Sequence, residues 1–260
     1  MLMLGEPQRT QFDLNFSVFG FPIRVSAFFW LIALFLGWGL VQEDPKLLFV
    51  WVLAVFVSIL VHELGHAFAF RYYGISSHIV LYQFGGLAIP DNISAGFGLG
   101  RSRSPLSQIV ISAAGPGVQL LTVVLIVVAV RLAGHRLPPV IPFLPELLLS
   151  GNGAPISNYA LFSLVSFLLY VNFYWAFLNL LPIYPLDGGQ IAREVFLLLS
   201  IPDGIRNSLI LSIVAAGGVA VFGVYQQRIF LALMFGMLAF SSYQALQRYS
   251  GGGFGGGRPW

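Results

Sequence analysis

Six apolar runs, each close to the length that a helix needs to cross a lipid bilayer, dominate the sequence. A spanning helix needs about 20 mostly apolar residues. Only 9% of the residues are charged, whereas a soluble domain carries about 25%. A chain this apolar cannot cover its own surface in water, so the sequence predicts a multi-pass membrane protein with about six transmembrane helices. The predicted spans are residues 26–42, 47–70, 106–130, 161–181, 207–225 and 228–247.

Two shorter segments are candidates for β structure. Residues 15–25 are too short, and too broken by glycine and proline, to span a membrane, and they are expected to form either strands or an interfacial entry segment. Residues 75–95 are rich in β-branched and aromatic residues and are interrupted by Gly85 and Gly86. Non-helical backbone at membrane depth must be buried in protein or line a water-filled cavity. We therefore expect an all-α membrane protein with a small membrane-associated β region, in which residues 75–95 form a hairpin that dips into the membrane.

Composition along the chain predicts three parts. Residues 1–25 are an N-terminal cytoplasmic or interfacial segment, residues 26–247 are the six-helix transmembrane domain, and residues 248–260 are a flexible, glycine-rich cytoplasmic tail. Residues 134–160 hold five prolines and are expected to form a loop outside the membrane. We find no internal repeat and no separate soluble domain.

The placement of lysine and arginine predicts the orientation. With six spans both termini share one side, which carries nine of the 13 basic residues, and the opposite side carries four. Basic residues accumulate on the cytoplasmic side. The termini, and the ends of the second and fourth spans, are therefore expected to face the cytoplasm of a cell membrane. The formal charge of +3, without a basic run, argues against nucleic acid binding.

The end of the second span carries a metal-binding pattern, HELGH, formed by His62, Glu63 and His66. Residues four apart lie on one face of a helix, so both imidazoles can reach one Zn²⁺ at about 2.0–2.1 Å. Glu63 is placed to take a proton from water. The simpler interpretation is two histidines bonded to neighbouring helices. Ionisable residues inside a span cost about 2.5–3.5 kcal/mol on insertion scales and usually mark function, so we predict one catalytic zinc per chain.

A catalytic zinc has three protein ligands and one open position, so a third ligand must lie elsewhere. His135 and Glu146 fall on the opposite side of the predicted membrane, and His78 is expected to be an ordinary hydrogen-bonded residue. Asp187 follows the fourth span in NLLPIYPLDGGQ, where prolines fix an extended turn and glycines allow close backbone approach. Asp187 is the best candidate, although taken alone it is more simply a helix cap. Two further acidic residues are expected on a solvated helix face: Glu194 and Asp203.

Together these residues resemble the site-2 protease family of intramembrane zinc metalloproteases. HELGH is similar to the zinc-binding helix of the family, and NLLPIYPLDGG to its N-x-x-P-x-x-P-L-D-G-G signature. AAGPGVQL at residues 113–120 looks like its third-span A-A-G-P-x-x-N segment, and FGGLA at 84–88 like the Gly-Gly turn of its β region. The resemblance covers roughly residues 47–200, the expected catalytic core, and fits the compact members without a PDZ or CBS domain.

The resemblance also implies the roles of individual residues. Glu63 would be the general base, and Asn179, which matches the asparagine of the signature, would orient substrate or stabilise the oxyanion. Gln119 stands where the family usually has asparagine. It keeps the amide and adds a methylene, so a polar role in the site and a role in helix packing both remain open. The residues implied to bind zinc are His62, His66 and Asp187.

The resemblance implies a zinc metalloendopeptidase that hydrolyses transmembrane substrates by regulated intramembrane proteolysis. Its partners would be a transmembrane protein or peptide, the lipid bilayer of a prokaryotic cell, and a regulatory membrane protein. Residues 78–90 could hold an unwound substrate along an edge strand or form a purely structural hairpin. A transporter is the main rival, but the sequence lacks the two-fold symmetry that many transporters show. A catalytically inactive relative is disfavoured because the implied ligands and base are all present.

Overall fold

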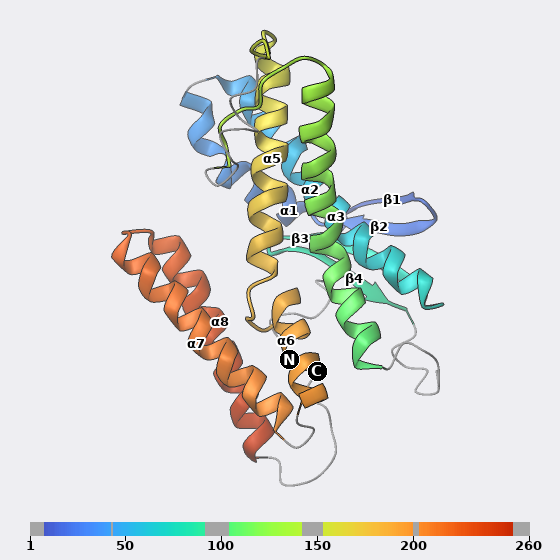
Figure 1. Ribbon diagram of the computed structural model, residues 1–260, viewed down its shortest axis with the longest axis vertical. Coiled ribbons are helices and arrows are strands. Elements are labelled where there is room, and N and C mark those ends of the chain that lie inside the picture. Colours follow the sequence, from blue (N-terminus) through green and yellow to red (C-terminus); the bar gives the residue numbers. More distant parts are fainter. Residues whose placement is uncertain (1–7, 43, 92–103, 142–152, 200–202, 252–260) are drawn as a thin grey trace. The chain divides into compact units, whose positions relative to one another are not determined.

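The computed structural model describes residues 8–42, 44–91, 104–141, 153–199 and 203–251 (Figure 1). The chain divides into two units, each of which is described by itself. The first unit contains Met1–Phe97 and Ala114–Ala176, and the second contains Gly98–Ala113 and Phe177–Trp260. The HELGH motif therefore lies in the first unit and the LDGG motif in the second.

Helices form most of the described chain. Two of them, α3 and α5, have residues in both units. The helices that begin before the LDGG motif are α1 (Ala27–Leu36), the 3₁₀ helix η1 (Trp38–Gln42), α2 (Pro45–Tyr72), α3 (Pro105–Leu132) and α5 (Tyr159–Asn179). The helices from that motif onward are α6 (Asp187–Leu199), α7 (Gly204–Tyr225) and α8 (Ile229–Gly251).

Five of the described helices are long and apolar enough to cross a membrane, namely α2, α3, α5, α7 and α8. They confirm a multi-pass membrane protein. The first expected span, residues 26–42, is instead the ten-residue helix α1 followed by η1. Helix α1 ends at Gly37, a residue type common at helix C-termini, and a side chain at position 37 would collide with Trp51 of α2. The indole N–H of Trp51 also donates to the carbonyl of Ala33, at 3.0 Å.

Local signals explain where α2 begins. Asp44 precedes it, and the Asp44 carboxylate accepts a hydrogen bond from the backbone N–H of Lys46 at 2.9 Å. Pro45 occupies the first turn, where its missing N–H leaves no helix bond unmade. The resulting helix has 28 residues, enough to carry the HELGH motif well inside a regular stretch.

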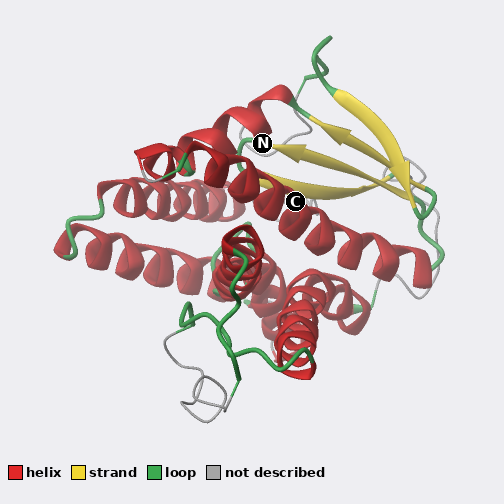
Figure 2. Ribbon diagram, turned by 90° about the horizontal axis from the view of Figure 1, so that it is seen from above, coloured by secondary structure: helices red, strands yellow, loops and turns green. Residues whose placement is uncertain are grey.

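The β region is a four-stranded sheet in the order β1-β2-β3-β4 (Figure 2). Its strands are β1 (Leu14–Val18), β2 (Phe21–Val25), β3 (Ser77–Tyr82) and β4 (Gly85–Pro90). Strands β1 and β2 are antiparallel, β2 and β3 are parallel, and β3 and β4 form an antiparallel hairpin. Both predicted β segments are confirmed as far as they are described. A parallel pair needs a long crossover, and here α1, η1 and α2 supply it.

The sheet and α2 share one apolar core within the first unit. Ile59 and Leu64 of α2 pack with Ile23 of β2 and with Ile79 and Leu81 of β3. Since Ile59 and Leu64 flank the first histidine of HELGH, the same packing that buries the sheet also fixes this part of α2. The candidate metal-binding turn is thus held on a rigid scaffold.

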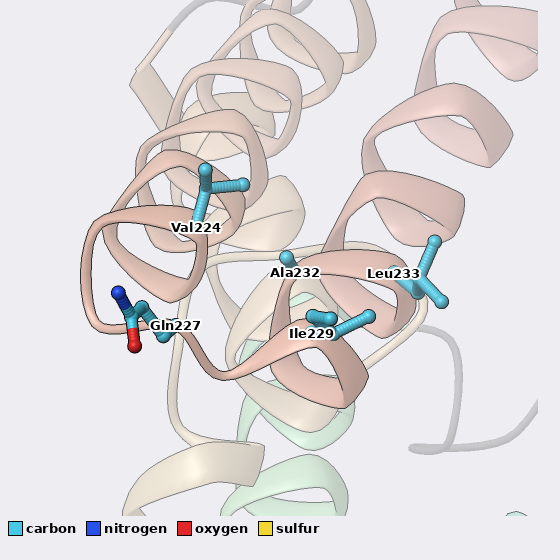
Figure 3. A pocket seen from close by; sticks show the side chains of 5 residues that line it. All are labelled: Val224, Gln227, Ile229, Ala232 and Leu233. Atoms are coloured by element: carbon cyan, nitrogen blue, oxygen red, sulfur yellow. The ribbon is translucent and has the colours of Figure 1, made fainter.

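In the second unit α7 and α8 form an antiparallel hairpin joined by a tight turn. Gly223 allows the backbone at Ala232 to approach, because a Cβ at position 223 would lie 2.8 Å from the nitrogen of Ala232. A hollow of about 570 Å³ lies at this turn (Figure 3). Its lining of four aliphatic residues and one amide offers neither a metal ligand nor a general base. The lining residues are Val224, Gln227, Ile229, Ala232 and Leu233.

Two expected segments lie partly outside the described residues. The predicted glycine-rich tail begins at residue 248, but α8 continues to Gly251, and residues 252–260 are outside the description. Of the predicted loop at 134–160, residues 142–152, which include Glu146, are outside it as well. The three predicted domains therefore remain a prediction.

Candidate active site

His62 and His66 face each other one turn apart on α2. Both side chains are buried, and their rings are nearly perpendicular, at 76° with centroids 4.7 Å apart. The two Nε2 atoms are separated by 3.1 Å. The expected convergence of the two imidazoles is therefore present within the first unit.

The geometry and chemistry of this pair fit a zinc ion. At Zn–N distances of about 2.0–2.1 Å, two nitrogens on one tetrahedral zinc lie about 3.3–3.4 Å apart, close to the observed 3.1 Å. Gly115 of α3 lies against Nε2 of His66, and a Cβ at position 115 would collide with that ring. Because Gly115 has no side chain, the space beside Nε2 of His66 is not filled from α3.

Small residues bring α3 against the HELGH turn. A Cβ at Gly65 would lie 2.6 Å from the carbonyl oxygen of Ala114 and 3.0 Å from Cα of Gly115. The two backbones are therefore in direct contact. These approaches give a physical reason for Gly65 and Gly115, because a side chain at position 65 would press on the α3 backbone and one at position 115 on the ring of His66.

Glu63 is buried beside the histidine pair. One of its carboxylate oxygens, Oε1, lies 4.0 Å from Nε2 of His62. Strand β4 approaches on the other side, where Gly86 lies so close that a Cβ would collide with the Glu63 side chain. Burial, and then the negative charge of Glu63, raise the pKa of Tyr82 on β3 to about 12.

Gln119 of α3 contacts His62 directly. Its Oε1 lies 2.9 Å from Nδ1 of His62, and its Nε2 donates to the backbone carbonyl of Ser58 at 3.2 Å. The side chain is fully buried, at 0% exposure. Gln119 therefore touches the ring nitrogen of His62 that faces away from His66, and it links α3 to α2.

The described part of α5 also holds a buried amide that no sequence motif marked. Asn172 of α5 is 1% exposed, and its amide donates to Oγ of Ser58 and to the carbonyl of Leu168, both at 2.8 Å. A single amide in the middle of an apolar span was the signal that could have found it, because polar side chains in membrane helices usually have a partner or a function.

Asp187 begins α6 in the second unit and is buried, at 8% exposure. The expected extended turn before it is wrong, because the chain makes two consecutive tight turns. Ile183 N–H donates to the carbonyl of Leu181 at 2.7 Å, and Leu186 N–H donates to the carbonyl of Ile183 at 2.8 Å. The Tyr184–Pro185 peptide is cis.

A hydroxyl of α7 anchors these turns. Ser212 Oγ accepts from the backbone N–H of Tyr184 at 3.0 Å and lies 3.3 Å from the carbonyl of Pro182. The expected close approach at the glycines is confirmed, because a Cβ at Gly188 would collide with the backbone of Leu180 and one at Gly189 would lie 2.5 Å from the carbonyl carbon of Ile183. The start of α6 is thus fixed by main-chain contacts.

The remaining candidates divide into confirmed and corrected predictions. His78 is hydrogen-bonded as expected, with Nδ1 2.6 Å from Oδ1 of Asp91. Asp203 is exposed as expected and precedes α7. The solvated position expected for Glu194 is wrong, since it is only 8% exposed, 3.5 Å from Arg193. The amphipathic pattern of the α6 sequence does not show which face of the helix is covered by other parts of the protein, and so did not reveal that Glu194 is buried.

Two further residues are placed without a resolved role. Asn179 is the last residue of α5 and is half-buried. His135 follows α3, and its backbone forms an isolated bridge with Ala154.

Comparison with known proteins gives concordant findings. The sequence profile described as Peptidase family M50 matches residues 50–222. The Zinc metalloprotease MJ0392 of Methanocaldococcus jannaschii is 26% identical over 182 residues, which are 69% of this chain and 44% of that protein. A Synechocystis protein named as a candidate zinc metalloprotease is 27% identical over 191 residues, 69% of this chain and 42% of its own length. The chain thus spans less than half the length of these relatives.

A solved structure shares the fold. The Site-2 Protease from Methanocaldococcus jannaschii matches with a TM-score of 0.55 at 22% identity, covering 90% of this chain and 94% of that chain. The relatives named as zinc metalloproteases imply a zinc cofactor, which agrees with the nitrogen donors of the histidine pair. The family profile covers well over half of the sequence. The chain therefore belongs to peptidase family M50 and has the fold of the site-2 proteases.

Proposed function

We propose that this chain is an intramembrane zinc metalloendopeptidase that cleaves transmembrane substrates. The observation that carries the proposal is the buried pair of imidazole nitrogens 3.1 Å apart, with a buried carboxylate next to it on the same helix. His62, His66 and Asp187 are the proposed ligands. Asp187 is supported by its match to the family signature and by the main-chain contacts that fix it at the start of α6.

The proposed mechanism assigns proton transfer to Glu63. Bound zinc would polarise the scissile carbonyl and lower the pKa of water at the site. Glu63 accepts the proton of the attacking water and later delivers it to the leaving amine. Its burial suits this role, because a carboxylate shielded from bulk water keeps the proton within the site. We propose that Asn179 orients the substrate or donates to the developing oxyanion.

The sheet suggests how a substrate is held. A transmembrane helix hides its carbonyls in internal hydrogen bonds, so it must unwind before cleavage. Strand β4 lies at the end of the sheet order, and its Gly86 lies against Glu63. A peptide added to the edge of β4 by main-chain pairing would run past the general base in an extended conformation.

Orientation and physiology extend the proposal. By the distribution of basic residues, the termini and the active site face the cytoplasm of a prokaryotic cell, where cleavage would release a domain from the membrane. Such a release fits regulated intramembrane proteolysis. Prior trimming of the substrate, or a membrane partner, would then regulate cleavage.

The test is proteolysis in reconstituted vesicles. Purified protein is mixed with a panel of tagged single-span membrane peptides, and the products are read by mass spectrometry. We expect zinc-dependent cleavage within or near the span, and its loss in Glu63→Gln by about 10²–10⁴-fold, the usual contribution of a general base. A peptide that is cut equally by Glu63→Gln would contradict the mechanism.

A further inference from the structure

The contact between Gln119 and His62 fixes the direction of one hydrogen bond. The backbone carbonyl of Ser58 can only accept, so the amide group that faces it, at 3.2 Å, must be the NH₂ of Gln119. The carbonyl oxygen of the Gln119 amide then faces Nδ1 of His62, at 2.9 Å. An amide oxygen can only accept, so Nδ1 of His62 must carry the proton.

The tautomer of His62 follows from this bond. A neutral imidazole carries one proton, and if it sits on Nδ1, then Nε2 presents a lone pair. Nε2 is the atom that faces His66 across 3.1 Å. Metal-binding histidines commonly donate their other N–H to a fixed acceptor, which sets the ring orientation and the tautomer.

The acceptor itself is held rigidly. Gln119 is fully buried between α2 and α3, and the residue to which it donates, Ser58, is also bonded through its hydroxyl by Asn172 of α5. Three helices of the first unit therefore meet around the Gln119 amide. Rotation of that amide would place its oxygen against the Ser58 carbonyl, which is unfavourable in a buried site.

We propose that Gln119 is a positioning residue that holds His62 in its Nδ1–H tautomer and keeps Nε2 available to zinc. The inference rests on the proposed function, since it assigns His62 as a ligand. It gives the glutamine at the usual asparagine position a specific role. The extra methylene lets the amide of α3 reach the outer nitrogen of His62 while its NH₂ still bonds to α2.

The first measurement is the tautomer of His62 in zinc-free protein. Nitrogen-15 NMR of histidine-labelled protein is practical because the chain has only four histidines, and His62→Gln assigns the signal. We expect a protonated Nδ1 and an unprotonated Nε2. A wild-type protein whose His62 carries its proton on Nε2 would overturn the inference without any variant at position 119.

The second measurement is zinc affinity by competition with a chelator. Gln119→Leu removes both polar groups and is expected to weaken zinc binding by about 10- to 100-fold. Gln119→Glu keeps an acceptor for Nδ1–H but loses the donor to the Ser58 carbonyl, so it is expected to recover only part of that loss. Thr122→Val is the matched control in α3, because the Thr122 hydroxyl bonds only within its own helix, to the carbonyl of Val118 at 2.9 Å.

The outcomes separate three cases. Gln119→Leu with wild-type zinc affinity would overturn the positioning role. If Gln119→Leu does not fold, the wild-type tautomer decides the question. Folded wild-type protein that binds no zinc would contradict the proposed function, whereas the tautomer of His62 can still be measured in that protein.

Discussion

The two units fix their proposed zinc ligands in different ways. In the first unit His62 and His66 lie on an uninterrupted helix, and their positions follow from helical spacing and from side-chain contacts with Gln119. In the second unit Asp187 follows two tight turns, and its position follows from the path of the main chain. We infer that substitutions around the imidazole rings disturb His62 and His66, whereas substitutions that loosen the tight turns disturb Asp187.

The largest expected effect comes from closing the space beside His66. In Gly115→Ala the new methyl group would collide with the imidazole at Nε2, so the ring must turn or α3 must move. We expect zinc affinity to fall by about 100-fold or more, the upper end for disturbed metal surroundings. Chelator competition measures it. Gly117→Ala is the control on the same helix, since a Cβ there meets nothing within 4 Å; equal zinc affinity in both variants would refute the account.

A smaller effect is expected at the approach of β4 to the proposed base. In Gly86→Ala the methyl group would press on the Glu63 side chain and move it from its place. General base catalysis contributes about 10²–10⁴-fold to the rate. We expect kcat to fall by part of this factor, while the zinc content stays the same. Steady-state kinetics on a peptide cleaved by the wild type, with elemental analysis of the same sample, measure both. Loss of zinc together with activity would mean that Gly86 supports the metal site itself.

In the second unit the anchor of the turns is the sensitive point. Ser212→Ala removes the hydroxyl that accepts from Tyr184 N–H and approaches the carbonyl of Pro182. We expect a loss of about 1 kcal/mol in the free energy of unfolding and weaker zinc binding. Thermal unfolding in detergent measures the loss of stability. Ser208→Ala is the control, since its hydroxyl bonds only within α7, to the carbonyl of Ile205, and a loss as large in this control would argue against a special role for Ser212.

The smallest effect is expected at Asn172. It bonds to the hydroxyl of Ser58, whereas Gln119 bonds to the carbonyl of the same residue, so the histidine tautomer does not depend on it directly. Interhelical hydrogen bonds in membranes average about 0.6 kcal/mol, and we expect Asn172→Leu to lower stability by about this amount. Zinc affinity should stay within twofold of the wild type, as read by chelator competition. A loss as large as that of Gln119→Leu would show that the two amides act as one unit.

The same contrast explains what the sequence could predict. Helical spacing placed His62 and His66 together, and apolar runs located the five long helices, because both follow from local periodicity. Helix α1 ends at Gly37, inside the first apolar run, and the length of the apolar run does not show that break. The first expected span was therefore too long.

Other features depend on partners far along the chain. Gln119 lies 57 residues from the histidine that it contacts, so its departure from the family asparagine could be noticed but not interpreted. The tight turns before Asp187 depend on Ser212, and the burial of Glu194 depends on tertiary packing. Sequence patterns identify the type of such residues, and only the fold shows their neighbours.

The central claim is a single zinc held by His62, His66 and Asp187, and metal content tests it most directly. Elemental analysis of detergent-purified protein should find one zinc per chain in the wild type. It should find little or none in Asp187→Ala that still unfolds cooperatively. Folded wild-type protein without zinc, or an Asp187→Ala variant that keeps one tightly bound zinc, would contradict the account.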